Sequence, residues 1–426
     1  ATARIGDVRY WRNTGENMGT ADQFVQDRLL GVDALAYSLN WADLDVDGDL
    51  DLVTGSYDVS LEKQMGELYK ETGQSGVFVY QQQADNTFIP TRLAEKAQAL
   101  ALEVSDIDMD GRLDIMVGND FDTRDQVWLN RDGTWAEATP FTTTTHSTMS
   151  FDTGDINNDG SPEFFAADMH PYSDAPEIME QWQPVIDTMP HNLPADDPQR
   201  MFNVLQVRDE AGQYTNLAAQ THVVSDGSGH SIEATGWSWS GKFGDLNQDG
   251  FLDFYIVNGM AAQEIFSHLP NDELIEENQA FRNKVGQSFV LAPEWDLGST
   301  RGGRSMSMAD LDGDGDLDIL VNNLRAPAQI FENQLCEGAA LLMDVRWPNS
   351  GNTYAIGTQL ALHTSTGTYT RRVRVSSGYL SGDAARVHFG LPVNSEIEML
   401  EVRWPDGEVS TVHGLTHQEI LQIARQ

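Results

Sequence analysis

The stretch "WADLDVDGDLDL" at residues 41–52 is the most informative part of this sequence, because five aspartates alternate along it: Asp43, Asp45, Asp47, Asp49 and Asp51. Carboxylates this close together repel one another, which costs stability unless a cation neutralises them. With a glycine at position 48, the spacing follows the pattern Asp-x-Asp/Asn-x-Asp-Gly-x-x-Asp/Glu. The pattern is therefore either an isolated acidic turn or one copy of a repeated unit.

The pattern is repeated. It occurs as "DLDVDGDLD" (43–51), "DIDMDGRLD" (106–114), "DINNDGSPE" (155–163), "DLNQDGFLD" (245–253) and "DLDGDGDLD" (310–318), called loops 1 to 5 from here on. A single match is often only an acidic surface turn. Five matches, each with glycine at the sixth position and a strand-like segment behind it, favour a metal-binding loop.

The spacing suits calcium, which takes six to eight oxygen ligands at about 2.3–2.6 Å in a flexible shell. Acids or amides at positions 1, 3 and 5 converge only if the chain turns sharply, which glycine permits. Position 7 offers its backbone carbonyl, so we expect the side chain of Asp49 to face solvent, and the acid at position 9 closes the shell. The predicted ligands of about five Ca²⁺ ions are Asp43, Asp45, Asp47, Asp49, Asp51, Asp106, Asp108, Asp110, Arg112, Asp114, Asp155, Asn157, Asp159, Ser161, Glu163, Asp245, Asn247, Asp249, Phe251, Asp253, Asp310, Asp312, Asp314, Asp316 and Asp318.

These loops differ from EF-hands. An EF-hand requires a bidentate glutamate at position 12 and flanking helices. Position 12 is occupied here by Thr54, Val117, Ala166, Ile256 and Val321. Short β-branched and aromatic runs follow each loop instead, and such runs are typical of buried strands.

The segments between the loops predict the architecture. Two further strand-like segments follow each of the first four loops, so the repeated unit is strand, loop, strand, strand, strand, which is typical of a propeller blade. Residues 1–335 are therefore predicted to be an all-β propeller of about six or seven blades, five of them with calcium loops. Segments 8–13 and 23–29 look like outer strands of a further blade, and the segments near 60–76 and 170–199 look like insertions, the second with a short helix.

The sequence pattern changes at Cys336. No acidic loop follows, and alternating segments such as "RRVRVS" and "EVRW" predict half-buried strands with a hairpin turn at "PDG". Residues 336–426 are predicted to form a small β-sandwich domain of their own.

Both parts resemble known families. The repeats resemble the FG-GAP/VCBS calcium-binding repeats of β-propellers, on the motif "DxDxDGxxD" followed by an apolar strand. The C-terminal segment resembles the ASPIC/UnbV domain of the cartilage acidic protein family, on "AIGTQLAL" (355–362), "SSGYLSGDAARVHFGLP" (376–392) and "EVRWPDG" (401–407). It departs from that pattern at Thr353 and at Gly382, where the family usually has arginine and glutamine. A binding site built from those polar residues would be altered here.

The composition of the chain excludes some classes of binding partner and indicates where the protein is located. A formal charge of −40 repels nucleic acid and anionic lipid, and no apolar run is long enough for a membrane span. The single cysteine excludes an intrachain disulfide. Calcium loops of this kind bind at extracellular calcium levels, so an extracellular, cell-surface or periplasmic location is expected. The given chain shows no signal peptide, and a removed leader or a trimmed start would each account for Ala1.

Three functions remain open. The first is a calcium-stabilised scaffold or adhesion-type protein that presents a rigid acidic surface to a protein, matrix or cell-surface partner. The second is a lectin-like propeller, with Trp237 and Trp239 as sugar-stacking candidates, although core packing suits them better. The third is a lyase or hydrolase acting on carbohydrate, but no catalytic motif singles out a residue. Oligomeric state is not predicted.

Overall fold

The computed structural model describes residues 2–4, 7–15, 23–121, 123–188, 194, 196–221, 231–335, 338–417 and 420–425. The chain forms two compact units, Ala1–Ala138 and Thr139–Gln426. The predicted boundary at residues 335 and 336 stays a prediction, and Cys336 lies outside the described residues. No helix in these ranges is long and apolar enough to cross a membrane.

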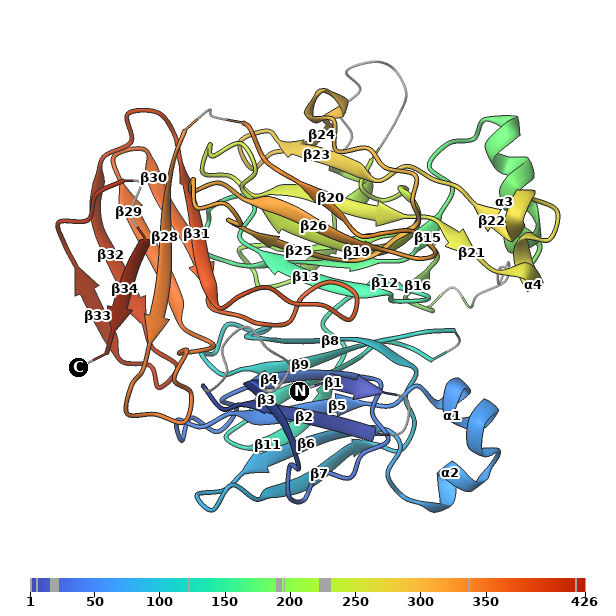
Figure 1. Cartoon of the computed structure of the whole chain (residues 1–426), viewed down its shortest axis with the longest axis horizontal. Helices are drawn as coiled ribbons and strands as arrows, with labels where there is room; N and C mark the ends of the chain where they lie inside the picture. The colour runs from blue at the N-terminus through green and yellow to red at the C-terminus, as the bar shows by residue number, and fades with distance from the viewer. Residues whose placement is uncertain are drawn as a thin grey trace. The chain divides into compact units, whose positions relative to one another are not determined.

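The first unit contains two antiparallel four-stranded sheets that follow chain order, as expected of blades (Figure 1). Blade 1 consists of β4 (Ser38–Ala42), β5 (Asp51–Gly55), β6 (Val77–Gln82) and β7 (Phe88–Ala94). Blade 2 consists of β8 (Ala99–Ser105), β9 (Asp114–Asn119), β10 (Gln126–Arg131) and β11 (Thr134–Ala138). The predicted N-terminal strands form a three-stranded sheet of β1 (Thr2–Arg4), β2 (Asp7–Asn13) and β3 (Phe24–Asp27).

The second unit contains three more sheets of the same kind. Blade 3 consists of β13 (Ser150–Gly154), β14 (Glu163–Ala167), β17 (Val204–Arg208) and β18 (Tyr214–Asn216). Blade 4 consists of β19 (Gly236–Gly244), β20 (Asp253–Asn258), β23 (Gln279–Asn283) and β24 (Phe289–Leu291), with β15 (Met169–His170) added on β19. Blade 5 has three strands in the described part, β25 (Gly303–Ala309), β26 (Asp318–Asn323) and β27 (Gln329–Phe331). The fold is all-β and of the propeller type, as predicted.

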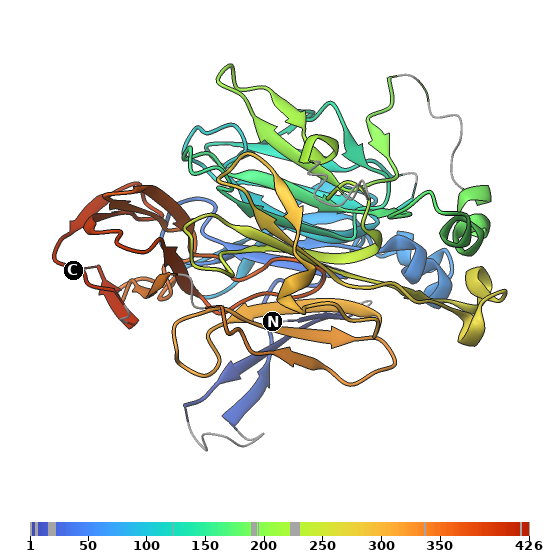
Figure 2. The same cartoon turned by 90° about the horizontal axis from the view of Figure 1, so that it is seen from above.

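The insertions are helical. The first holds α1 (Asp58–Met65) and α2 (Leu68–Glu71), and the second holds the predicted helix as α3 (Pro176–Thr188). Figures 1 and 2 both place α3 beside α4 (Gln263–Phe266), which lies in the segment between β20 and β23. Short elements complete these connections: β12 (Thr144–Thr145) paired with β16 (Gln199–Arg200), β21 (Met260–Ala261) paired with β22 (Glu273–Leu274), and the 3₁₀ turns Ala218–Thr221, Pro270–Asp272 and Pro293–Trp295.

The C-terminal segment forms the predicted β-sandwich, which appears in red in Figure 2. One sheet contains β28 (Ala339–Arg346), β31 (Arg386–Leu391) and β34 (Ile420–Ala424), and the other contains β29 (Gln359–Thr364), β30 (Gly367–Arg372), β32 (Ile397–Arg403) and β33 (Val409–Val412). Their inward side chains fill a common core that includes Leu341, Leu362, Phe389, Leu400 and Trp404.

The second strands of blades 1 to 4 explain why the apolar runs behind their loops are continuous. Strands β5, β9, β14 and β20 are buried at every residue, and a strand buried on both faces carries apolar side chains on both. Between blades 1 and 2, for example, Val53 and Val79 pack with Ile115 and Val117. Stacking thus buries faces that one blade alone would expose to water.

An asparagine joins neighbouring blades. The Asn283 side chain on β23 donates hydrogen bonds to the carbonyls of Ile156 in loop 3 (2.8 Å) and Leu252 in loop 4 (2.9 Å), and it accepts one from the Gly286 N–H (2.8 Å). The same pair of donations recurs in two other blades: Asn130 to Leu44 and Leu113, and Asn333 to Leu246 and Leu317. We call these three side chains the asparagine ladder.

Replacing Asn283 by alanine is expected to lower the free energy of unfolding by about 1–3 kcal/mol, because two buried carbonyl groups lose their hydrogen-bond donor. Asn283→Asp should be at least as damaging, since the carboxylate cannot donate and adds a buried charge. The measurement is urea unfolding, with alanine at the exposed Asn349 as the matched control. Equal stabilities for all three variants would contradict the role of the ladder.

Candidate metal centres

Each acidic loop connects the first and second strands of its blade, and its backbone is held by its own carboxylates. The position-1 acid accepts a hydrogen bond from the N–H of the position-6 glycine in loops 1 to 4, at 2.8–3.1 Å. In loop 5, Asp310 accepts instead from Gly313, at 2.7 Å. The position-5 acid accepts from the N–H of position 7 in all five loops, at 2.8–3.1 Å. In each loop the backbone is therefore folded around its own position-1 and position-5 carboxylates.

Two residues of each loop have a left-handed backbone conformation with positive φ. The sequence pattern identifies only one of them, the glycine at position 6. The position-6 glycines have φ between 90° and 100°. Position 4 is also left-handed, with φ of 64° at Val46, 63° at Met109, 58° at Asn158, 59° at Gln248 and 86° at Gly313. A β-branched residue such as Val46 is disfavoured in this conformation, so the rest of the loop must hold it there.

The position-9 acid has a structural role that sequence reasoning missed. It is the first residue of the second strand, and one of its oxygens accepts the N–H of position 2 in all five loops, at 2.8–3.0 Å. In four loops its other oxygen accepts a backbone N–H from or next to the third strand, as Asp253 does from Asn283 (2.9 Å). In loop 3, the Glu163 Oε1 accepts instead from the Asn157 side chain (3.1 Å). A carboxylate oxygen has a second lone pair, so this bracing leaves the acid able to bind a cation as well.

Burial raises the pKa of these acids. Asp43 is 3% exposed, and its burial, followed by the charges of Asp47 and Asp45, raises its pKa to about 7. Burial likewise raises the pKa of Asp51 to about 7, of Asp245 to about 7 and of Glu163 to about 9. Buried carboxylates that resist ionisation at neutral pH require either a proton or a cation.

Position 7 differs from the expectation in two loops. Asp49 does not face solvent: its side chain is half-buried, its Oδ1 is buried without a hydrogen-bond donor, and burial with the nearby Asp47 charge raises its pKa to about 6. Asp316 of loop 5 is only 4% exposed and has the same kind of orphaned Oδ1. The side chains of Asp49 and Asp316 are thus less exposed than predicted, whereas the carbonyl ligand at position 7 stays a prediction.

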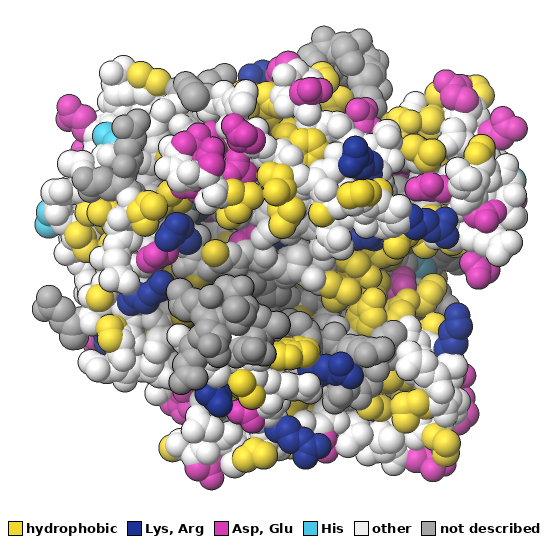
Figure 3. Space-filling model, viewed as in Figure 1, with side chains coloured by type: hydrophobic (Ala, Val, Ile, Leu, Met, Phe, Trp, Pro, Cys, Tyr) yellow, Lys and Arg dark blue, Asp and Glu magenta, His cyan; other side chains and the backbone are white. Residues whose placement is uncertain are grey.

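Three loops bring carboxylates close enough to share an ion. Single oxygens of Asp43, Asp45 and Asp47 lie within 4.8 Å of one another, as do those of Asp106, Asp108 and Asp114 and those of Asp310, Asp312 and Asp318. The buried Oδ1 of Asp43 also accepts no hydrogen bond. Hard oxygen donors with orphaned lone pairs fit a hard divalent cation, so the chain has several acidic clusters that could hold a metal ion. Figure 3 shows one compact group of acidic side chains on the face it draws, with the other acidic side chains scattered over that face.

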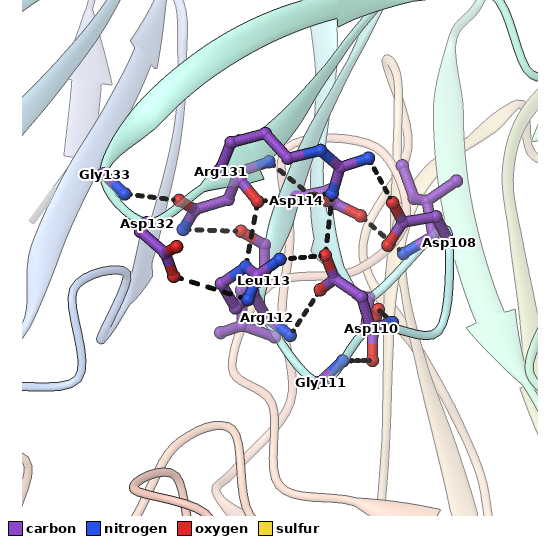
Figure 4. A network of polar contacts seen from close by, with 12 residues as sticks. Asp108, Asp110, Gly111, Arg112, Leu113, Asp114, Arg131, Asp132 and Gly133 are labelled. Carbon is purple, nitrogen blue, oxygen red and sulfur yellow. Dashed lines mark hydrogen bonds and ion pairs between the residues drawn. The ribbon is translucent and has the colours of Figure 1, made fainter.

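Loop 2 is partly neutralised by arginines (Figure 4). Arg131 at the end of β10 contacts Asp108 through Nη2 (2.5 Å) and Asp110 through Nη1 (2.7 Å). Arg112, at position 7 of the loop, also pairs with Asp110. In the described part of the chain, no acid of loop 1 or loop 5 has such an ion pair.

Loops 3 and 4 lie against the β-sandwich. The Thr370 hydroxyl on β30 donates to Asp155, the position-1 acid of loop 3. Burial lowers the pKa of the neighbouring Arg371, and the charges of Asp245 and Asp155 oppose this shift. Both loops therefore have a guanidinium nearby, and each also has an asparagine at position 3 in place of an aspartate.

Of the two tryptophan candidates for sugar binding, Trp237 is buried and Trp239 is partly buried. Trp237 is 6% exposed and stacks on Trp182 of α3, with ring centroids 5.8 Å apart. The Oε1 and Oε2 of buried Glu276 accept the Trp182 indole N–H (3.0 Å) and the Trp237 backbone N–H (2.6 Å). Trp239 is covered by Arg304 and by the ring of Tyr379. These contacts dock the second insertion and leave no open stacking face at Trp237.

Comparison with known families agrees with the geometry. The FG-GAP-like repeat model matches residues 106–166 and 262–321, which include loops 2, 3 and 5. The ASPIC and UnbV model matches residues 345–426. The chain is thus a protein with FG-GAP-like repeats followed by an ASPIC and UnbV domain.

One curated relative is Cartilage acidic protein 1 of Xenopus tropicalis, which is 31% identical over 113 residues. The match covers 26% of this chain and 17% of the relative, so the chain spans a small part of that protein. Solved structures with similarity include the V. cholerae biofilm matrix protein Bap1 (11% identity, 90% of this chain and 60% of that chain, TM-score 0.32) and the exotype rhamnogalacturonan lyase YesX (12% identity, 91% and 74%, TM-score 0.36). At these TM-scores the likeness supports no conclusion about function.

The raised pKa values predict that the metal-free protein becomes less stable as the pH rises. Asp43 has a folded-state pKa of about 7 against an ordinary value of 3.8. Its contribution to stability is therefore full below the unfolded-state pKa and is lost as the pH rises through the folded-state pKa. Metal-free protein should melt at a higher temperature at pH 5 than at pH 8, and Asp43→Asn should reduce the difference. A metal-free melting temperature that rises with pH, or a slope unchanged by Asp43→Asn, would contradict this assignment.

Proposed function

We propose that this protein is a calcium-stabilised extracellular scaffold that presents a rigid acidic propeller surface to a protein or matrix partner. The observation that supports it best is the set of buried carboxylate oxygens in loops 1 and 5 that accept no hydrogen bond. Five loops of one geometry, at matching places in successive blades, make a structural role for the cation more reasonable than a catalytic one. Calcium bound there would neutralise the position-1 acids and fix the hairpin between the first two strands.

The five loops are expected to bind calcium with different affinities. Loops 1 and 5 each contain five aspartates at the odd positions and no ion-paired arginine among the described residues, so they should bind first. Loop 2 must displace Arg131 from Asp108 and Asp110. Loops 3 and 4 have fewer carboxylates and lie near Arg371. More carboxylates and fewer competing cations mean tighter binding.

An extracellular, cell-surface or periplasmic location follows from the same proposal. Loops of this kind in extracellular modules bind calcium at about 10⁻⁴–10⁻³ M, a concentration found outside cells. The relative Cartilage acidic protein 1 is a cartilage protein by its name, which fits this location. With a net charge of −40, the surface would favour basic or calcium-bridged partners over nucleic acid or anionic lipid.

Calcium should raise the melting temperature by more than about 10 °C, because several ions bind only the folded chain and each adds about 2.7 kcal/mol at 100 times its dissociation constant. Asp43→Asn should remove part of this shift, and Asp49→Asn should remove a measurable part as well. Ser161→Ala is the matched control, because position 7 of loop 3 offers no carboxylate. The measurement is differential scanning calorimetry with calcium and with chelator. An unchanged melting temperature in chelator would refute calcium binding.

The scaffold role is tested by binding of the purified chain to a panel of extracellular-matrix proteins and to a glycan array, with calcium and with chelator. Calcium-dependent binding to a matrix protein that Asp43→Asn and Asp318→Asn weaken would support the proposal. Glycan binding that withstands chelation would favour a lectin. Turnover of a carbohydrate substrate would favour a lyase or hydrolase and overturn the scaffold.

A further inference from the structure

A long loop of the β-sandwich lies on the propeller strands of the same unit. Residues 373–385, called the sandwich loop, connect β30 to β31. In it, the Gly378 N–H donates to the Phe151 carbonyl on β13 (2.8 Å), and the Tyr379 N–H donates to the Ser240 hydroxyl on β19 (3.2 Å). The Ser307 Oγ on β25 lies 2.8 Å from the Gly382 carbonyl oxygen. The loop thus contacts the first strands of blades 3, 4 and 5.

The fit of the sandwich loop depends on its glycines. A Cβ on Gly378, whose φ is 67°, would lie 2.3 Å from the Ser240 Oγ. A Cβ on Gly382 would lie 1.9 Å from the Val375 carbonyl oxygen. The glycine that departs from the family pattern at position 382 is therefore required by the close path of this chain, and a glutamine there would clash.

The loop ends in a carboxylate held by donors from the propeller. The Lys242 Nζ on β19 lies 2.9 Å from both oxygens of Asp383. The Ser307 hydroxyl and the Met308 backbone N–H on β25 each donate to Asp383 Oδ1 (2.9 Å). The loop itself adds only the Ser377 hydroxyl, at 3.1 Å from Oδ2. Three of the four donor groups therefore belong to two neighbouring blades.

The electrostatics of this pocket favour an anion strongly. Lys242 is 1% exposed, and a buried ammonium group without a counter-ion is very unfavourable. Burial would raise the pKa of Asp383, but the Lys242 charge and the hydrogen bonds outweigh it, and the pKa lies below its ordinary value. The Asp383 side chain remains 24% exposed, so a small ion can reach the site from that side.

We propose that Lys242, the Ser307 hydroxyl and the Met308 N–H form a carboxylate-binding site on the first strands of blades 4 and 5, which Asp383 occupies from the same chain. The ligand class is a carboxylate on a short, glycine-containing segment or a small free carboxylate. The site uses no residue of the five acidic loops. A second ion pair of opposite polarity, Arg374 Nη1 to buried Asp152 Oδ1 (2.6 Å), holds the other end of the sandwich loop.

The test is rescue of an emptied site in the full-length chain. Asp383→Ala removes the carboxylate and leaves the donors, so it should lower the melting temperature by about 10 °C. Formate or acetate should then recover most of the loss, relative to chloride at equal ionic strength and pH. Asp383→Asn should not be rescued, because its amide still fills the site.

Two controls separate a binding site from a general salt effect. Asp344→Ala breaks the more exposed ion pair with Arg386 and should gain nothing from formate over chloride. The double variant Asp383→Ala with Lys242→Met should also gain nothing, because the cation is gone. If Asp383→Ala does not fold in chloride, the yield of folded protein on refolding is compared in formate and chloride. Equal results in the two salts for Asp383→Ala, in melting or in refolding, would overturn the site.

Discussion

The structure depends on one repeated interaction, the hydrogen bond from the position-2 N–H to the buried position-9 carboxylate. This contact closes every acidic loop, and it places the acid at the first residue of the strand that is packed between blades. In loop 4, the carboxylate of Asp253 also receives the N–H of Asn283, so one side chain joins the loop, the second strand and the third strand. A buried carboxylate held in this way costs free energy unless its charge is neutralised, so the same bracing favours either a proton or a cation in the loop.

Much of this architecture was predictable from the sequence because it depends on patterns of residues close together in the chain. The glycine at position 6, the alternating acids and the apolar runs behind them have local causes, so the loops, the strands that follow them and helix α3 were predicted. The ladder residue Asn283 was not predicted, because its partner Ile156 is 127 residues away. The inward side chain of Asp49 was predicted wrongly, because the motif describes a backbone ligand and cannot show where an extra carboxylate turns. Lys242 gave no signal, since a lysine in a strand normally points to water.

The five loops have similar backbone conformations but different charged neighbours. Under the proposed function, loops 1 and 5 would depend on an external cation, whereas Arg131 beside loop 2 and Arg371 near loops 3 and 4 supply fixed positive charge. A guanidinium is always charged and cannot be removed by dilution or chelation. If calcium binds as proposed, the loops with an arginine nearby would keep some compensating charge when calcium is removed, whereas loops 1 and 5 would lose theirs. The sandwich loop adds a further fixed charge contact, between Lys242 and Asp383, on a different set of strands.

The asparagine ladder also joins residues that are synthesised at different times. Asn130 reaches back 86 residues to the loop of blade 1, Asn333 reaches back 87 residues to loop 4, and Asn283 reaches back 127 residues to loop 3. During synthesis, each of these loops leaves the ribosome well before the side chain that completes it. Each of these loops can therefore obtain its asparagine contact only after the later blade that carries the asparagine has been synthesised.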